Sequence, residues 1–268
     1  MRNIRLVVAY DGTDFRGWQR QPDGPTIQGC LEDRLEQLTG AAVSVIGSGR
    51  TDAGVHALGQ VANFQTESSI PCENLAKALN HLLPPTVRIM RAEEIPACFH
   101  SRYDVVSKTY RYRILTSRIC SPFLWRFVCH YPYPLDRACM AEAARRLEGG
   151  QDFTSFAATG DEEEDAGKSK VRTIDRSRLL WRPRTSMLVY EVKGKGFLRY
   201  MVRNIVGTLM EVGRGKLTPA DIPRILAARD RTQAGPTAPA QGLCLVKVEY
   251  GRLAERNTLA GAPPANPL

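Results

Sequence analysis

One short stretch of the sequence combines a carboxylate, a guanidinium and a flexible backbone. Arg50 and Asp52 stand two residues apart in GSGRTDAG, residues 47–54, between two segments that read as strands. The glycines allow left-handed backbone conformations and the close approach of a ligand. A carboxylate in such a loop suits nucleophilic or general-base chemistry. A tight turn capped by Asp52 is the alternative, and spacing alone does not decide between the two.

Other chemistries fit these residues less well. A kinase-like or nucleotide-hydrolysing enzyme would use a glycine loop, but GSGRTDAG lacks the lysine and the spacing of a phosphate-binding loop. Asp52 and His56 are spaced for a metal site, yet no further ligand cluster accompanies them. The seven cysteines form no C-x-x-C pair, which disfavours zinc. A non-catalytic RNA-binding module would explain the charge of the chain, but not a carboxylate in this loop.

The composition is that of a globular protein with a basic surface. The 268 residues are 43% hydrophobic and carry a formal charge of +9. This excess suggests a polyanionic partner, with nucleic acid first and an anionic membrane surface second, and solubility alone is the alternative. No apolar run approaches the ~20 residues of a membrane span, and the N-terminal apolar run is too short for a signal peptide. We therefore expect a cytoplasmic protein with no membrane partner.

The first half of the chain reads as a β-α-β-β-α-β series, the order of a ferredoxin-like fold. Apolar periodicity predicts strands over residues 4–10, 43–46, 59–64 and 87–90 and helices over residues 27–38 and 73–83. Thr26 is the expected N-cap of the first helix, and Gly40 its C-terminal stop. Phe15 and Trp18 lie among arginines in the loop that follows the first strand. They suit stacking on RNA bases, or else the tryptophan is tucked under the loop.

The second half begins with the alternating segment KTYRYRIL, residues 108–115, in which Tyr110 and Tyr112 share one face. A helix over residues 137–147 is expected after Asp136 as N-cap, and another helix after Thr218 as N-cap. Strands are expected over residues 173–181, 186–192 and 242–250. Between them, residues 194–213 carry an apolar helical stripe. The acidic run of residues 160–170 predicts a mobile loop.

Several motifs resemble those of the tRNA pseudouridine synthase A family, and the resemblance covers nearly the whole chain. They are GRTDAGVHALGQV at residues 49–61, KTYRY at 108–112, MVRNIVGTL at 201–209 and DRTQAGPTAPAQGL at 230–243. FHSRY at residues 99–103 resembles the FHAR segment of the family, whose cation, here Arg102, is thought to lie near RNA. In QDFTSFA, residues 151–157, a glutamine stands where the family usually has histidine.

The resemblance implies an α+β fold of two pseudo-symmetric ferredoxin-like halves, whose antiparallel sheets flank a central active-site cleft. Residues 1–102 would form the N-terminal half with the aspartate loop. Residues 103–258 would form the C-terminal half, and residues 259–268 a disordered tail. The family also implies a homodimer.

The same resemblance assigns roles to five side chains. Asp52 is the expected catalytic residue, and Arg203 its partner. Tyr110 is expected to stack on the target base and Leu243 to pack against it, while Arg50 fills the vacated stack or holds a phosphate. The non-catalytic alternatives are a solvated helix arginine at position 203, tyrosines that belong to the core, and structural roles for the histidines.

The implied reaction converts uridine to pseudouridine in the anticodon arm of tRNA. The family resemblance, and not any single residue, implies uridines 38, 39 and 40 as targets. The reaction changes no oxidation state and loses no atoms, so we expect neither a cofactor nor a metal. Asp52 would attack or deprotonate a nucleoside that has left its stack.

Overall fold

A computed structural model describes residues 1–159 and 169–251 and divides the chain into two compact units. Of the described residues, the first unit holds Met1–Val106 and residues 246–251, and the second holds Ser107–Leu245 without the undescribed residues 160–168. The sequence placed the boundary after residue 102 and kept residues 103–258 together, whereas in this division the later residues of the last strand return to the first unit. This return depends on contacts between distant segments, so no local sequence pattern predicts it. The expected acidic loop and C-terminal tail fall largely or wholly on residues outside the described ranges.

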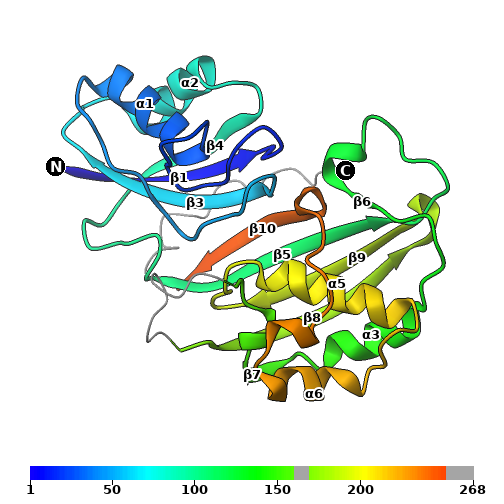
Figure 1. The fold of residues 1–268 in the computed structure, drawn as a ribbon. Helices are drawn as coiled ribbons and strands as arrows, with labels where there is room; N and C mark the ends of the chain where they lie inside the picture. The colour runs from blue at the N-terminus through cyan, green and yellow to red at the C-terminus, as the bar shows by residue number, and fades with distance from the viewer. Residues whose placement is uncertain (160–168, 252–268) are drawn as a thin grey trace. The chain divides into compact units, whose positions relative to one another are not determined.

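The first unit is built on antiparallel strands, which Figure 1 shows beside α1 and α2. Strand β1 (Arg2–Tyr10) lies between β3 (His56–Thr66) and β4 (Val87–Ile95). The two-residue strand β2 (Ile46–Gly47) pairs with the other edge of β3. The expected strand over residues 43–46 was therefore placed too early. Its Val45 instead bonds through its backbone to side chains of the first helix, with the N–H donating to Glu32 and the C=O accepting from Gln28.

Two helices accompany these strands, and local signals predicted both. Helix α1 (Ile27–Thr39) begins after Thr26, whose hydroxyl accepts from Gly29 N at 3.2 Å, and ends at Gly40 in a left-handed conformation with φ of 73°. Its apolar stripe is buried, as the periodicity predicted. Helix α2 (Cys72–Leu82) has no side-chain cap and begins one residue earlier than expected.

The second unit has its own antiparallel strands. Strand β5 (Val105–Leu115) pairs with β9 (Met187–Gly194), which pairs with β8 (Val171–Arg182), which pairs with β7 (Gly149–Asp152). The short strand β6 (Cys129–His130) adds in parallel to the end of β5. Strand β10 (Leu243–Tyr250) starts beside β5 in this unit, and its later residues belong to the first unit.

The α-helices of the second unit are α3 (Arg137–Arg145), α5 (Met201–Gly213) and α6 (Asp221–Ala228). The carboxylate of Asp136 caps α3 by accepting from Cys139 N at 2.9 Å, as expected. The prediction of Thr218 as the cap of α6 was wrong. The helix begins at Asp221, whose carboxylate accepts from the Thr218 N–H and hydroxyl at 2.8 and 2.9 Å. Figure 1 shows α3 and α5 on one side of the strands of their unit.

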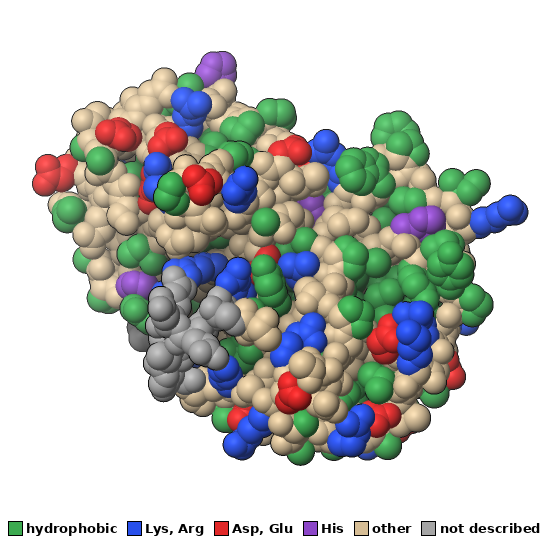
Figure 2. Space-filling model, in the orientation of Figure 1, with side chains coloured by type: hydrophobic (Ala, Val, Ile, Leu, Met, Phe, Trp, Pro, Cys, Tyr) green, Lys and Arg blue, Asp and Glu red, His purple; other side chains and the backbone are tan. Residues whose placement is uncertain are grey.

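Short 3-10 helices connect these elements: η1 (Trp125–Phe127), η2 (Thr154–Phe156), η3 (Pro183–Thr185), η4 (Arg231–Gln233) and η5 (Ala240–Gly242). The segment around η1 is apolar and exposed, with Ile119 79% and Phe123 87% accessible. On the face drawn in Figure 2, hydrophobic side chains gather over the part of the second unit that holds β6. Large exposed apolar groups of this kind favour contact with another molecule.

Candidate functional site

The loop that carries Asp52 rests on a second loop, which follows β1. The Trp18 N–H donates to Thr51 O at 3.0 Å, and the Gly54 N–H donates to Phe15 O at 3.3 Å. The hydroxyls of Tyr10 and Thr51 are 2.8 Å apart and share a hydrogen bond. These bonds bracket position 52 on both sides, so the backbone at the carboxylate is fixed by its neighbours.

Two glycines allow these loops to approach so closely. A Cβ on Gly17, whose φ is +91°, would lie 2.5 Å from Thr51 O. A Cβ on Gly12 would lie 2.1 Å from Val55 O. Both distances are far below van der Waals contact, so each position accepts a residue without a side chain and little else.

The aromatic residues of this region, Trp18 and Phe15, are buried. Trp18 is 2% exposed, and the backbone at Gly47 packs so close to its indole that an added Cβ would lie 2.5 Å away. Phe15 is also buried. Of the two interpretations open from the sequence, the structure decides for the tucked tryptophan. Stacking of these two side chains on RNA is wrong because their faces are already covered.

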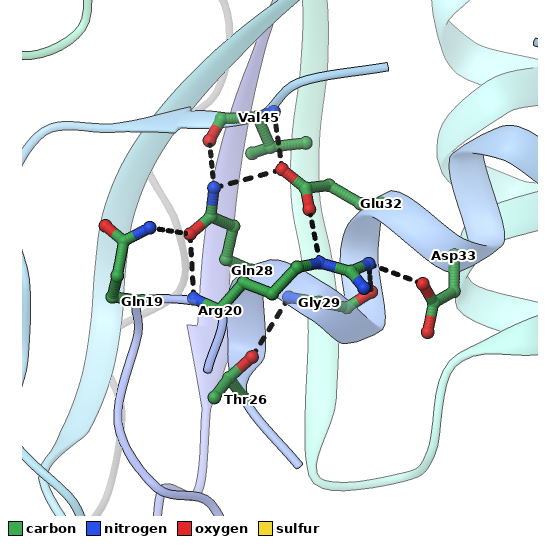
Figure 3. A network of polar contacts seen from close by, with 8 residues as sticks. All are labelled: Gln19, Arg20, Thr26, Gln28, Gly29, Glu32, Asp33 and Val45. Carbon is green, nitrogen blue, oxygen red and sulfur yellow. Dashed lines mark hydrogen bonds and ion pairs between the residues drawn. The ribbon is translucent and has the colours of Figure 1, made fainter. Parts of the chain in front are cut away.

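A polar network ties α1 to the entrance of the Asp52 loop (Figure 3). Arg20 pairs with Glu32 at 2.8 Å and with Asp33, so the arginine is held by carboxylates of the helix. Gln28 accepts from Gln19 and from the Arg20 N–H, and Glu32 accepts from the Gln28 amide and the Val45 N–H. The network thereby fixes where the chain enters the loop.

Further bonds hold the loop from the side of β3. The Ser48 hydroxyl donates to Gln60 Oε1 at 2.6 Å, and Gln60 Nε2 donates to Gly49 O at 2.9 Å. The buried Ser101 hydroxyl donates to Ile46 O. Asp52 itself is partly exposed, and its carbonyl accepts from the Val55 N–H at 3.1 Å. A carboxylate on a rigid backbone at the surface can meet a substrate without a large rearrangement.

Arg50 is exposed at the entrance of the same loop. Its Nε donates to Gln19 Oε1 at 3.3 Å, a contact to the loop that follows β1. The arrangement is compatible with either role expected for Arg50, and those roles stay predictions.

The two histidines near the motifs serve the fold. His56 is 5% exposed, and its Nδ1 accepts from the Gly12 N–H at 3.1 Å. Nδ1 of His100 accepts from the Arg102 N–H at 3.2 Å. The structural interpretation of both is therefore the better one. Within residues 1–159 and 169–251, no group of three or more His, Cys, Asp or Glu side chains could hold a metal ion.

In the second unit, Arg203 is held in place by the loop that precedes β10. Its Nε donates to Ala238 O at 2.8 Å, and the Ala238 N–H donates back to Arg203 O at 3.1 Å. The guanidinium carbon lies 5.0 Å from the centre of the Tyr200 ring, within cation–π range. Tyr200 precedes α5 with φ of 60°, an uncommon backbone conformation for an aromatic residue. These contacts exclude a freely solvated helix arginine at position 203.

Asn204, the next residue, lies fully buried at a junction of three segments. Its Nδ2 donates to Phe156 O at 2.8 Å. Its Oδ1 accepts from the Thr237 hydroxyl at 2.6 Å and from Arg231 Nη2 at 3.0 Å. One side chain thereby joins α5 to η2 and to the loop of residues 230–241, and it fixes the segment beside Arg203.

The same loop also approaches the backbone of α5 very closely. A Cβ on Gly207 would lie 1.6 Å from Pro236 O, and a Cβ on Gly235 would lie 2.7 Å from the Cα of Thr208. The Gly235 N–H also donates to the Thr208 hydroxyl at 2.8 Å. The two motifs MVRNIVGTL and DRTQAGPTAPAQGL thus pack against each other around Arg203.

Tyr110 and Tyr112 lie on the same face of β5 but have different partners. The Tyr112 ring is buried against Gly242, where an added Cβ would lie 2.5 Å away, and its hydroxyl donates to Pro239 O at 2.8 Å. Burial raises the pKa of this hydroxyl well above its usual range, so it donates as a neutral phenol. Tyr112 is therefore the core tyrosine. Tyr110, 7% exposed, meets the Phe197 ring edge-on at 5.2 Å between centroids.

The candidate residues fall into two groups. Asp52 and Arg50 belong to the first unit, and Tyr110, Arg203 and Leu243 to the second. In the second unit, Ala238 and Pro239 accept from Arg203 and Tyr112 respectively, so adjacent carbonyls align α5 and β5 with the start of β10. Leu243, which is 5% exposed, is the first residue of that strand.

Comparison with known proteins identifies the family. A family model described as tRNA pseudouridine synthase matches residues 6–104 and 143–251. The chain belongs to the tRNA pseudouridine synthase family. It is therefore an enzyme of the class that isomerises uridine to pseudouridine.

Curated relatives agree with this assignment over nearly their full lengths. A tRNA pseudouridine synthase A of Solibacter usitatus is 56% identical over 93% of this chain and 100% of its own. Proteins of the same name from Brevibacillus brevis and Caldicellulosiruptor saccharolyticus are 47% and 44% identical, each over 93% of this chain and 100% of its own. Among the described helices, none is long and apolar enough to cross a membrane.

Sequence reasoning missed the residues that position Arg203 and Tyr112. Asn204, Gly207, Thr208, Gly235 and Gly242 all lie inside the quoted motifs, yet none was singled out. Small residues at helix positions 207 and 208 could have indicated a close backbone approach, since glycine inside a helix normally destabilises it.

Proposed function

We propose that this protein isomerises uridines 38, 39 and 40 in the anticodon arm of tRNA, with Asp52 as the reacting carboxylate. The observation that carries the proposal is the placement of Asp52 in a family motif whose loop is bonded on both sides and leaves the residue partly exposed. Membership of the family supplies the reaction and the class of substrate.

The reaction needs one ionised carboxylate and no redox chemistry. The bond between ribose C1′ and uracil N1 breaks, the ring turns, and a new bond forms between C1′ and C5. The hydrogen on C5 leaves as a proton, and a proton is restored at N1. Asp52 acts at C1′ or C6 as a nucleophile, or as a base. These steps require no cofactor.

The second unit supplies the remaining roles that we propose. Arg203 is the partner of the aspartate and favours its ionised form, since a nearby cation lowers a carboxyl pKa. Tyr110 stacks on the uracil and Leu243 covers another side. Such stacking contributes roughly 1–3 kcal/mol per base, which offsets much of the few kcal/mol that base flipping costs. Arg50 holds a phosphate or fills the vacated stack.

The strand orders support the proposal of two related halves. In the first unit the order is β4-β1-β3-β2, with α1 and α2 between successive strands. In the second unit it is β10-β5-β9-β8, with α3 before β8 and α5 and α6 before β10. Both orders match a β-α-β-β-α-β unit. We also propose a cytoplasmic homodimer, for which the exposed apolar segment around Phe123 offers a contact surface.

The proposed role of Asp52 is tested by Asp52→Asn, with Asp23→Asn as the matched control at an exposed position of the same unit. Each purified variant is incubated with tRNA that carries 5-tritiated uridine, and released tritium is counted. We expect no release above background from Asp52→Asn, unchanged tRNA binding, and wild-type release from Asp23→Asn. Activity of Asp52→Asn within tenfold of wild type would refute the role. Mapping of pseudouridine in the product tests the target positions.

A further inference from the structure

The strands of the second unit place a row of charged residues on one face. The register sets Glu191 of β9 opposite Arg111 of β5 and opposite Arg178 of β8, so the three side chains lie side by side. Trp181 points to the other side of β8 from Arg178. The guanidinium carbon of Arg137, on α3, lies 4.3 Å from the centre of the Trp181 ring. Side chains alternate along a strand, so the charged row lies on the face away from α3.

Glu191 is the centre of this row and is almost completely buried, with 1% of its side chain exposed. Its Oε2 accepts from Arg111 Nε at 2.8 Å, and its Oε1 accepts from Arg178 Nη2 at 2.7 Å. Arg176 Nη2 lies 3.1 Å from Oε1. Burial alone would raise the pKa of this carboxyl, but the hydrogen bonds from Arg111 and Arg178 outweigh burial and hold the pKa below its usual range.

One carboxylate cannot balance three guanidinium groups. The side chains of Arg111, Arg176 and Arg178 remain 43%, 44% and 46% exposed while they contact Glu191. Each guanidinium has five N–H donors, and the carboxylate accepts only a few of the fifteen. Glu191 therefore orients three arginines and leaves many of their donors directed to solvent.

More cations share this face. The same face also carries Arg113 of β5, Arg182 of β8 and Lys193 of β9. The described strands β5, β8 and β9 hold one other carboxylate, that of Asp175, which lies at the irregularity between Ile174 and Arg176, so cations still outnumber carboxylates. Strands lie ~4.8 Å apart and alternate residues ~6.7 Å apart along a strand, so the donors form a two-dimensional array across three strands. A rigid array of arginine forks suits phosphate groups, which guanidinium binds in a bidentate manner.

We propose that this face, defined by Arg111, Arg113, Arg176, Arg178, Arg182 and Lys193, binds backbone phosphates of the tRNA. The inference rests on the proposed function for the identity of the polyanion. It adds a contact surface to the residues proposed to act on the uridine. The array contacts phosphates alone, so it contributes affinity for any tRNA sequence and takes no part in the chemical step.

The test uses cations that make no contact with Glu191, so that the fold is spared. The variant is Arg113→Gln with Arg182→Gln, and the control is Arg145→Gln with Arg146→Gln, two exposed residues at the C-terminal end of α3. Dissociation constants for unmodified tRNA are measured between 50 and 200 mM salt. We expect the variant to bind about tenfold more weakly, with a salt slope reduced by about two, and to keep the wild-type kcat at saturating tRNA. The control should match wild type.

Each other outcome would overturn the proposal. If the variant binds tRNA with the same affinity and the same salt dependence as the control, the face does not contact phosphates. Sedimentation that shows loss of a wild-type dimer in the variant would make the face an interface between copies. Binding of wild type to anionic vesicles that the variant alone loses, with tRNA binding unchanged, would assign the face to a membrane. Failure of wild type to form pseudouridine refutes the proposed function instead, and the tRNA affinity of the variant still decides this inference.

Discussion

Replacement of Asn204 by alanine tests whether the segment around Arg203 is held by one side chain. The variant loses the bond to Phe156 O at 2.8 Å and the bonds from Thr237 and Arg231 at 2.6 and 3.0 Å. Two of these bonds are neutral and one comes from a guanidinium. The partners stay in place, so the Phe156 carbonyl loses this donor and the Thr237 hydroxyl loses its acceptor.

The expected loss of stability follows from these three bonds, since the fourth contact, from Asn204 Nδ2 to Ala157 O, is long at 3.4 Å and adds little. A neutral bond contributes about 1 kcal/mol and a bond to a charged group about 1.5–3 kcal/mol, which gives roughly 3.5–5 kcal/mol. Arg231 Nη2 also donates to the Thr237 hydroxyl at 3.1 Å, and this bond survives the substitution. We therefore expect about 3 kcal/mol. For a chain of this length that corresponds to a fall in Tm of ~6–12 °C.

Urea unfolding followed by circular dichroism measures the change directly. Asn74→Ala is the matched control, since Asn74 is exposed on α2, and it should stay within about 0.5 kcal/mol of wild type. The slope of free energy against urea must be unchanged for the comparison to hold. A difference below about 1 kcal/mol between Asn204→Ala and wild type would show that the three bonds do not hold this junction.

Two other perturbations follow from the same structure. Gly207→Ala places a Cβ 1.6 Å from Pro236 O, so α5 and the loop of residues 230–241 must separate. We expect the free energy of unfolding to fall by more than ~3 kcal/mol. The control Gly150→Ala, whose Cβ would have its nearest contact at 3.6 Å, should be tolerated. A stable Gly207→Ala variant would contradict this packing. The lowered pKa of Glu191 means that its stabilisation is complete above the unfolded pKa and is lost as the pH falls through the folded pKa. The stability difference between wild type and Glu191→Gln should therefore shrink between about pH 5 and pH 3, and a constant difference in urea unfolding would refute the ion-pair account.

Local signals predicted local structure well. The caps at Thr26 and Asp136 are hydrogen bonds within four residues, and both are present. The prediction failed at Thr218 because the Asp221 carboxylate three residues later accepts from both donors of Thr218. Side chains that compete for one backbone site cannot be ranked from residue types alone.

Features that depend on distant segments could not be predicted in the same way. The sequence left Trp18 either exposed or tucked, because its cover comes from Gly47, which lies far along the chain. The motifs identified Asp52 and Arg203 as candidate site residues, but they did not reveal the backbone contacts that hold these residues in place. Those contacts join segments that lie far apart in the sequence, such as Arg203 and Ala238, which are 35 residues apart, and no periodicity reveals them.

The insertion of the second unit into the first has a consequence for synthesis on the ribosome. Tyr250 packs its ring on Phe99 at 5.0 Å and donates to Ser101 O at 2.7 Å, yet about 140 residues separate it from the end of the preceding part of its unit. At ~5–20 residues per second, the nascent N-terminal part waits roughly 7–28 s for its last strand. During that interval the inserted unit emerges and can fold first, while the Phe99 segment lacks its aromatic partner. Nascent chains halted shortly before residue 246 should therefore recruit chaperones at this segment.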